Sequence, residues 1–245
     1  MNDAWSEVAG EWSELWGESG RPVWRAVAEG TGIRSGSRVL DVGCGGGEFL
    51  AWAAELGAVP TGVDPASGMV ALARTRVTSV ELGDFDSLPA GPFDLMTAFN
   101  ALQFAEDTDD ALAAMVAVAA PGGWVAVANW AERELNDLDV LERSVAEGDP
   151  APDGDLRLEG GLHELLVDGG LERVASGLVE MPWEPGSDDE LVRGVLLGED
   201  PSVLRELGPT VLAAAAPFKR GSGYRVINHF RYAIGRVVEK GSTRG

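Results

Sequence analysis

Short apolar runs alternate with segments of helical periodicity along the first third of this chain. The apolar runs occupy residues 39–42, 61–63 and 79–82, and the helical patterns occupy residues 48–56 and 67–74. Strands that alternate with helices pair in parallel, because each connecting helix crosses the sheet before the next strand begins. This part of the chain therefore predicts three parallel strands joined by two helices.

The same alternation continues through the rest of the chain. Further strands are predicted at residues 95–99, 124–128, 172–179 and 224–234, and further helices at residues 109–119 and 162–168. The pattern predicts an α/β fold with a seven-stranded, mostly parallel sheet and helices on both faces. At 245 residues the chain can form one such domain with insertions, so residues 1–245 are expected to be a single domain.

Two segments lie outside this minimal pattern, residues 131–160 and residues 185–217. The first joins a charged, helix-compatible stretch to a loop of proline, glycine and aspartate. In the second, Ser187 is followed by three acids, which predicts a helix N-cap. Ligands of open α/β sheets bind beyond the carboxyl ends of the strands, where insertions can cover them. We expect both segments to form helical lid insertions on the substrate side.

Residues 1–30 carry an unusual density of tryptophan in an acidic stretch. Trp5, Trp12 and Trp16 fall near one helical face, because they are spaced by seven and four residues. One interpretation is a strap, a helix docked on the domain by this apolar stripe. The other is an amino-terminal helical lid whose aromatic face closes a pocket.

Charge and composition narrow the class of protein. The formal net charge is −21, and nucleic-acid binders need a basic surface, so RNA and DNA are not expected partners. No apolar run reaches the length of a membrane span, and the first residues do not resemble a signal peptide, which predicts a cytoplasmic protein with no membrane partner. Two lysines among many arginines and alanines are typical of a GC-rich bacterial genome.

The first predicted strand enters a glycine-dense turn, Gly43-Cys44-Gly45-Gly46-Gly47, which leads directly into a helical pattern. Glycines let the backbone turn sharply and approach a ligand closely, and the N–H groups at a helix start are free to bind it. A dinucleotide-binding fingerprint from Gly43 needs glycine at its sixth position, where Glu48 stands. The turn predicts a nucleotide-cofactor cradle and argues against a nicotinamide oxidoreductase.

Further motifs follow the turn in order. Asp64 ends the second strand about twenty residues later, Gly83-Asp84-Phe85 follows the third, and Pro121-Gly122-Gly123 opens the fifth. Together with Asp41-x-Gly43-x-Gly45-x-Gly47, this order resembles the motifs of class I S-adenosylmethionine-dependent methyltransferases of small-molecule type. The resemblance covers residues 38–129, and it implies a Rossmann-like fold with S-adenosylmethionine as cofactor.

The resemblance also implies which residues form the site. The cofactor-binding candidates are Asp41, Gly43, Cys44, Gly45, Asp64, Pro65, Met69, Asp84, Phe85 and Asn100. In this assignment Asp64 accepts the ribose hydroxyls, Asp84 meets the adenine amino group, and Phe85 packs on the ring. Cys44 is expected to be a small residue beside the cofactor and not a nucleophile. Trp12, Phe104 and Trp130 are assigned to the substrate pocket, and no metal ligands are assigned.

The chain departs from the family where a catalytic histidine often stands. The family pattern there is Leu-x-His, whereas this chain has Leu102-Gln103-Phe104, so no general base carries over. His229 is a candidate base, with a structural or surface histidine as the favoured alternative. Tyr224 and an acid from the lid segments also stay open.

The predicted function is methyl transfer to an O, N or C atom of a small metabolite, by in-line displacement with the acceptor held in position. An alternative keeps bound S-adenosylmethionine as a charge that is not consumed, for a cyclisation or a decarboxylation. A binding module without chemistry is a third hypothesis. The sequence leaves the acceptor and the oligomeric state open.

Overall fold

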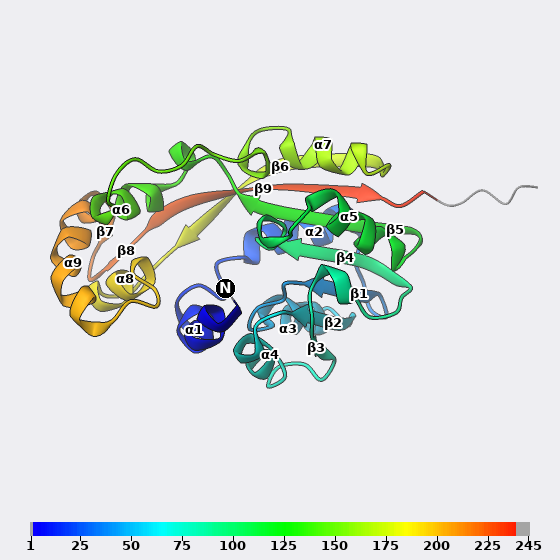
Figure 1. The fold of residues 1–245 in the computed structure, drawn as a ribbon, viewed down its shortest axis with the longest axis horizontal. Helices are drawn as coiled ribbons and strands as arrows, with labels where there is room; N and C mark the ends of the chain where they lie inside the picture. Colours follow the sequence, from blue (N-terminus) through cyan, green and yellow to red (C-terminus); the bar gives the residue numbers. More distant parts are fainter. Residues whose placement is uncertain (1, 239–245) are drawn as a thin grey trace, which may run out of the picture.

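The computed structural model describes residues 2–238 and contains the expected seven-stranded sheet, in the order β3-β2-β1-β4-β5-β9-β6 (Figure 1). Its strands are β1 Arg38–Val42, β2 Val59–Asp64, β3 Val80–Leu82, β4 Phe93–Phe99, β5 Ala119–Trp130, β6 Glu172–Trp183 and β9 Val226–Arg236. The first five strands pair in parallel, and β9 runs antiparallel between β5 and β6. The predicted α/β fold with a mostly parallel sheet is confirmed.

The helices fall close to their predicted positions. They are α1 Asn2–Leu15, α2 Arg21–Thr31, α3 Glu48–Glu55, α4 Ser67–Ala73, α5 Thr108–Ala117, α6 Asp137–Val145, α7 Gly161–Asp168, α8 Asp188–Val195 and α9 Pro201–Ala214. The helix predicted to run to residue 119 ends at Ala117, because the Val118 carbonyl accepts a 3.0 Å hydrogen bond from the backbone N–H of Phe93 and the chain joins the sheet there. As predicted, Ser187 caps α8 by accepting from the backbone N–H of Glu190 at 3.1 Å.

Helices cover the sheet on both faces, and alternate strand residues bury into each layer. Leu40 and Met96 face the side covered by α5 and α7, whereas their neighbours Val39 and Leu95 face the side covered by α2 and α3. Side chains of adjacent residues in a strand point to opposite faces, so a strand covered on both faces reads as a continuous apolar run. This burial fixes the carboxyl ends of β1, β2 and β4 at one edge of the sheet.

The long strands β6 and β9 extend past their neighbours and carry a helical lobe, seen at the left of Figure 1. The lobe contains α6, α8, α9 and the short hairpin of β7 (Lys219–Arg220) and β8 (Gly223–Tyr224). Its core includes Leu141, Trp183 and Leu191. The lobe therefore combines the two segments, 131–160 and 185–217, that lay outside the minimal sequence pattern.

Helix α1 lies between the helical lobe and α4 (Figure 1). On the lobe side, Arg193 of α8 pairs with Glu11 at 2.7 Å and with Glu14 at 3.3 Å. On the α4 side, a side chain at Gly68 would come within 2.3 Å of the Ser6 carbonyl oxygen, so glycine permits the close approach. The helix therefore spans both parts of the molecule.

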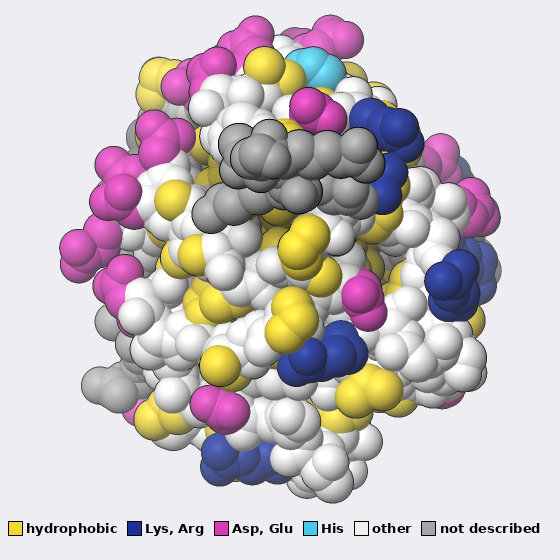
Figure 2. Space-filling view, turned by 90° about the vertical axis from the view of Figure 1, so that its right-hand side faces the viewer, with side chains coloured by type: hydrophobic (Ala, Val, Ile, Leu, Met, Phe, Trp, Pro, Cys, Tyr) yellow, Lys and Arg dark blue, Asp and Glu magenta, His cyan; other side chains and the backbone are white. Residues whose placement is uncertain are grey.

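The surface agrees with the acidic composition. On the face shown in Figure 2, acidic side chains gather along one flank, whereas lysine and arginine side chains form small separate groups. Within residues 2–238, no helix is both long enough and apolar enough to cross a membrane.

Candidate cofactor and acceptor site

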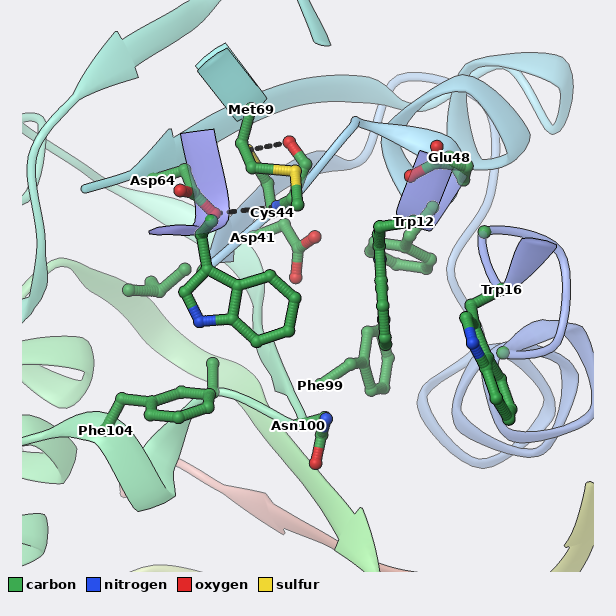
Figure 3. Close-up of a pocket in the computed structure, with 18 of the residues that line it drawn as sticks. Trp12, Trp16, Asp41, Cys44, Glu48, Asp64, Met69, Phe99, Asn100 and Phe104 are labelled. Atoms are coloured by element: carbon green, nitrogen blue, oxygen red, sulfur yellow. Dashed lines mark hydrogen bonds between the residues drawn. The ribbon is translucent and has the colours of Figure 1, made fainter. Parts of the chain in front are cut away.

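A cavity of about 270 Å³ lies at the carboxyl ends of β1, β2 and β4, beneath α1 (Figure 3). Every cofactor-binding and substrate-pocket candidate from the sequence lines it. These residues are Asp41, Gly43, Cys44, Gly45, Asp64, Pro65, Met69, Asp84, Phe85, Asn100, Trp12, Phe104 and Trp130. The fold therefore brings together side chains that are more than a hundred positions apart in sequence.

Asp41 supplies a buried carboxylate to this cavity. Its side chain is only 3% exposed, and Figure 3 shows the carboxylate pointing inward from the end of β1. Burial raises the pKa of Asp41 to about 7, the 2.6 Å hydrogen bond from the Thr97 hydroxyl opposes this rise, and the charges of Asp64 and Glu48 add to it. A bound cation would relieve this penalty, so the site is suited to a positively charged ligand.

Asp64 holds the glycine turn in shape. One carboxylate oxygen accepts from the backbone N–H of Gly45 at 2.8 Å, and the other accepts from the backbone N–H of Ala66 at 2.9 Å. Burial raises the pKa of Asp64, and these two hydrogen bonds oppose the shift. A carboxylate oxygen can accept more than one hydrogen bond, so this structural role leaves Asp64 acceptor capacity for the ribose hydroxyls that the sequence assigned to it.

The glycines of the turn leave room that a side chain would fill. Gly43 has φ +73°, and a Cβ there would lie 2.5 Å from the Cβ of Ala101. Gly45 has φ +53°, and a Cβ there would meet no atom within 4 Å. Because Gly45 lines the cavity, a side chain there would extend into the cavity space.

The far end of the cavity carries Asp84 and Phe85 after β3. The Asp84 carboxylate accepts from the backbone N–H of Asp86 at 3.1 Å, which caps a short helical turn, and its side chain is exposed. Phe85 is partly buried against the sheet core.

Burial and the neighbouring carboxylates raise the pKa of the Cys44 thiol, which argues against a reactive thiolate.

A row of aromatic side chains lies along the α1 side of the cavity. Trp5 meets Phe104 at a ring-centroid distance of 6.2 Å and Trp12 at 5.3 Å, both edge-on. Trp12 stacks on Trp16 at 6.1 Å, and Trp16 stacks on Trp183 at 4.0 Å. The predicted tryptophan face therefore both docks α1 and lines the cavity, so the strap and lid interpretations are compatible.

Asn100 stands at the boundary of a second cavity of about 260 Å³. The two cavities share Trp5, Trp12, Trp16, Asn100 and Trp130. Asn100 has φ +53°, a left-handed conformation that asparagine tolerates, and its side-chain oxygen accepts from the Gln103 amide at 2.8 Å. The second cavity thus lies directly beside the first.

Sequence reasoning missed the charged side of this second cavity, which is formed by Arg133, Asp139, Glu142 and Arg157. The sequence pattern indicates only a charged, helix-compatible stretch in this segment. The available signal was the amphipathic pattern of α6, in which buried Leu138 and Leu141 alternate with acids.

The structure places His229 outside the lining of both cavities. Its ring Nδ1 lies 2.6 Å from the Leu135 carbonyl oxygen, and its backbone N–H donates to the Asn136 side chain at 2.8 Å. Tyr224 is also remote, because its hydroxyl donates to Asp188 at 2.6 Å within the helical lobe. These contacts favour the structural interpretation of both residues.

Comparisons with known proteins match the part of the chain that contains the glycine turn. Residues 40–127 match the family described as "Methyltransferase domain". A ubiquinone biosynthesis O-methyltransferase of Bordetella bronchiseptica is 36% identical over 110 residues, which are 40% of this chain and 45% of that protein. The match thus spans less than half the length of this curated relative.

Solved structures share the fold across most of the chain. YcgJ of Bacillus subtilis superimposes with a TM-score of 0.57 at 19% identity, covering 88% of this chain and 98% of that one. The [4+2]-cyclase SpnF gives a TM-score of 0.56 at 24% identity, with 88% and 80% coverage. At these identities the likeness shows the fold alone.

The glycine turn, the sheet order and the family match define one class of protein. Over residues 40–127 the chain is similar to the methyltransferase-domain family, and its sheet order agrees with the class I S-adenosylmethionine-dependent fold. The resemblance read from the motifs is confirmed, and with it the cofactor class.

Proposed function

We propose that this protein transfers the methyl group of S-adenosylmethionine to a small-molecule acceptor, with a hydroxyl oxygen as the favoured acceptor atom. The observation that carries the proposal is the buried Asp41 carboxylate, which faces a cradle where Gly45 leaves open space. The O-methyltransferase relative supports a hydroxyl. The formal charge of −21 argues against nucleic acid, and we place the protein in a bacterial cytoplasm.

The residues of the cavity fit the cofactor in three places. Asp41 can balance positive charge, Asp64 can accept ribose hydroxyls, and Asp84 with Phe85 can hold the adenine. When bound, S-adenosylmethionine supplies an electrophilic methyl group on a sulfonium. Trp12 and Trp130 then exclude water and orient the acceptor, which can provide much of the rate enhancement for a displacement.

The direct test is to incubate the purified protein with S-adenosylmethionine and candidate acceptors, and to measure S-adenosylhomocysteine and methylated product by mass spectrometry. Equimolar formation of both supports methyl transfer. Conversion of an acceptor without S-adenosylhomocysteine would reject it.

A second candidate function uses the cofactor without consuming it. Two observations favour this second candidate function. The [4+2]-cyclase SpnF shares the fold, and Leu102-Gln103-Phe104 lacks the histidine of the family pattern Leu-x-His. The same assay decides, because a cyclisation or decarboxylation would yield product without loss of the methyl group.

Cofactor affinity should increase as the pH rises from about 5.5 to about 8. The pKa of Asp41 in the ligand-free protein is about 7, well above the value of about 3.9 for an unfolded chain, and a cationic ligand favours the ionised form. Calorimetry should give a dissociation constant at least about tenfold lower at the upper pH. Asp41→Asn should flatten this dependence, and a variant with the wild-type slope would exclude Asp41 as its source.

The raised pKa of Asp41 makes the ligand-free protein less stable as the pH rises, whereas cofactor binding becomes stronger. A folded-state pKa raised above the unfolded value stabilises the protein at low pH, and this contribution is lost as the pH rises through about 7. The melting temperature of the ligand-free protein should therefore decrease across this window more in the wild type than in Asp41→Asn.

Trp12→Ala should impair the acceptor more than the cofactor. Trp12 lines both cavities, so its loss opens the acceptor side to water. We expect kcat/KM for the acceptor to decrease at least about tenfold, roughly 1.4 kcal/mol, with a smaller change in cofactor affinity. Trp52→Ala is the matched control, because Trp52 is buried but lines neither cavity. It should lower the melting temperature and leave the kinetics unchanged at low temperature; the same behaviour in Trp12→Ala would reject the lid.

A further inference from the structure

Five residues line both cavities and therefore surround the boundary at which the cavities meet. They are four tryptophans and one asparagine: Trp5, Trp12, Trp16, Asn100 and Trp130. An indole N–H donates a hydrogen bond and does not accept one, whereas a side-chain amide has both an oxygen that accepts and an NH2 group that donates. The direction of the Asn100 amide therefore decides which polar group of the protein a ligand meets at this boundary.

Gln103 fixes the direction of the Asn100 amide. The side-chain nitrogen of Gln103 donates to the backbone carbonyl oxygen of Asn100 at 2.9 Å and to the side-chain oxygen of Asn100 at 2.8 Å. Because a backbone carbonyl only accepts, the group of Gln103 that faces it must be the NH2, and this NH2 in turn requires the oxygen of Asn100. The Asn100 oxygen is thus engaged, and its own NH2 group points away from Gln103.

The NH2 group of Asn100 has no partner among residues 2–238. Figure 3 shows the amide nitrogen on the side of Phe99 and Trp12, and the amide oxygen on the far side. The backbone is also held in place, because the Asn100 N–H donates to the Ala128 carbonyl oxygen of β5 at 2.7 Å. Asn100 therefore offers two oriented donors at the boundary between the cavities.

The tryptophans add further donors and apolar walls. The indole N–H of Trp16 donates to the Gly194 carbonyl oxygen at 3.1 Å, whereas those of Trp5, Trp12 and Trp130 have no acceptor in the described part of the chain. Neither an indole nor an amide takes up a proton at neutral pH. The side chains at the boundary can therefore hold an oxygen atom but cannot act as a base toward it.

Donors of this kind favour an oxygen anion over a neutral hydroxyl. A hydrogen bond to an ionised acceptor is roughly twice as strong as one to a neutral acceptor. In-line displacement also brings the reacting oxygen next to the positive sulfonium, and a neighbouring cation favours the ionised form. Burial among tryptophans disfavours an anion, but oriented donors and a nearby cation gain strength in the same apolar surroundings.

The charged groups of the two cavities are compatible with such an anion. The first cavity carries Asp41, Glu48, Asp64 and Asp84, and the second carries Arg133, Asp139, Glu142 and Arg157. The positive cofactor balances Asp41, and the buried Nε of Arg133 has no hydrogen-bond partner, so positive charge in the second cavity is not fully paired. Salt screens charges on the outer surface within about 8 Å, so the net charge of −21 acts weakly here.

Resting on the methyl transfer proposed above, we propose that the acceptor is an acidic phenol whose reacting hydroxyl binds as the oxygen anion, and that the NH2 group of Asn100 donates to this oxygen. Gln103 is the positioning residue, because it turns the NH2 group toward the boundary. The tryptophans hold the flat body of the phenol. An acceptor bound in this way needs no general base, which agrees with the absence of a histidine from Leu102-Gln103-Phe104.

The step balances in atoms and charge. The phenol releases its proton to water when it binds. Its oxygen anion then forms a bond to the methyl carbon, and the bond from that carbon to the cofactor sulfur breaks, with the electron pair remaining on sulfur. The anion and the sulfonium become a neutral ether and a neutral thioether, so no proton moves on the protein during the transfer.

The first test follows the ionisation of a bound probe by absorbance, with S-adenosylhomocysteine present so that no methyl group can be transferred. The probe is 4-nitrophenol, whose anion absorbs visible light. We expect the bound probe to be half-ionised at a pH at least about one unit below that of the free probe, which is a tenfold preference for the anion. Failure to bind, or half-ionisation at the pH of the free probe or above it, would overturn the assignment of the anion site.

Asn100→Gly removes the amide without straining the backbone, because Asn100 has φ +53° and glycine adopts this conformation freely. The pH of half-ionisation should return to that of the free probe, and thermal unfolding should show a folded variant. Asn100→Asp replaces the donors by a carboxylate and should move that pH above the free value. Glu106→Ala is the control, since this exposed side chain lines neither cavity, and it should titrate like the wild type. A wild-type titration in Asn100→Gly would exclude the amide as the donor.

Gln103→Leu tests whether Gln103 acts through Asn100. Without the Gln103 NH2 group the Asn100 amide can rotate, so the preference for the anion should decrease, though less than in Asn100→Gly. The double variant should titrate like Asn100→Gly alone, because a residue that acts only through a second residue has no effect once the second is removed. Additive effects of the two substitutions, or no effect of Gln103→Leu, would overturn the positioning role.

The last test measures S-adenosylhomocysteine formation at saturating cofactor with 4-methylphenol, which ionises near pH 10 as tyrosine does. If only the anion reacts, kcat/KM should increase about tenfold between about pH 8 and about pH 9. A rate independent of pH would reveal a base on the protein and overturn the proposed ionisation. If 4-nitrophenol binds as its anion but neither phenol yields S-adenosylhomocysteine, the methyl transfer fails and the anion site stands.

Discussion

Replacing Gly45 by valine should abolish S-adenosylmethionine binding, with affinity decreasing at least about 100-fold, or roughly 2.7 kcal/mol. The Cβ position of Gly45 points into open cavity space, so the valine methyl groups would occupy the volume that the cofactor needs. Calorimetry with S-adenosylmethionine gives the dissociation constant directly. Micromolar binding by the variant would show that the cofactor lies elsewhere.

The control for Gly45→Val must reproduce its backbone strain. Gly45 has φ +53°, a conformation that costs a residue other than glycine about 1–2 kcal/mol. Gly221→Val introduces the same residue at φ +61°, in a turn that lines neither cavity and where a Cβ also meets open space. Both variants should lose a similar amount of stability, and only Gly45→Val should lose the cofactor.

Asp64→Ala should weaken cofactor binding by about 1.5–3 kcal/mol, because it removes charge-assisted hydrogen bonds to the ribose. The structure adds a second cause: the N–H groups of Gly45 and Ala66 lose their acceptor, so the glycine turn loses its support. Calorimetry measures the affinity, and thermal unfolding shows whether the turn has loosened.

Asp64→Asn separates the two causes. The asparagine oxygen can still accept from one of the two N–H groups, whereas the charge toward the ribose is lost. We expect a melting temperature closer to the wild type than that of Asp64→Ala, with affinity still reduced. Unchanged affinity in both folded variants would remove Asp64 from the site.

Much of the cofactor side could be predicted from sequence because its determinants are local. A buried strand, a glycine turn and a helix start follow one another between Arg38 and Glu55, and the chain geometry alone brings them into contact. Asp64 ends one parallel strand and Asp84 closely follows the next, and the carboxyl ends of parallel strands share one edge. Residues at these positions therefore lie close together, whichever segments of the chain cover the sheet.

The second cavity depends on contacts between distant segments. Glu142 lies on a helix whose position is fixed by Asn228 and Ile227 of the last strand, some ninety residues away. Nothing in the periodicity of α6 indicates which strand it packs against. The charged side of the second cavity is therefore visible only in the folded chain.

The sequence by itself determined the class of fold, the cofactor cradle and the tryptophan face of α1, because hydrophobic period and glycine placement act over a few residues. The tertiary structure decided that α1 bridges α4 and the helical lobe, that His229 is bound to a backbone carbonyl, and that a charged cavity adjoins the cofactor site. The surroundings of His229 depend on the pairing of β9 between β5 and β6, which brings the last strand beside residues 135–138. Pairing of this kind is set by the burial of whole surfaces, which no local pattern encodes.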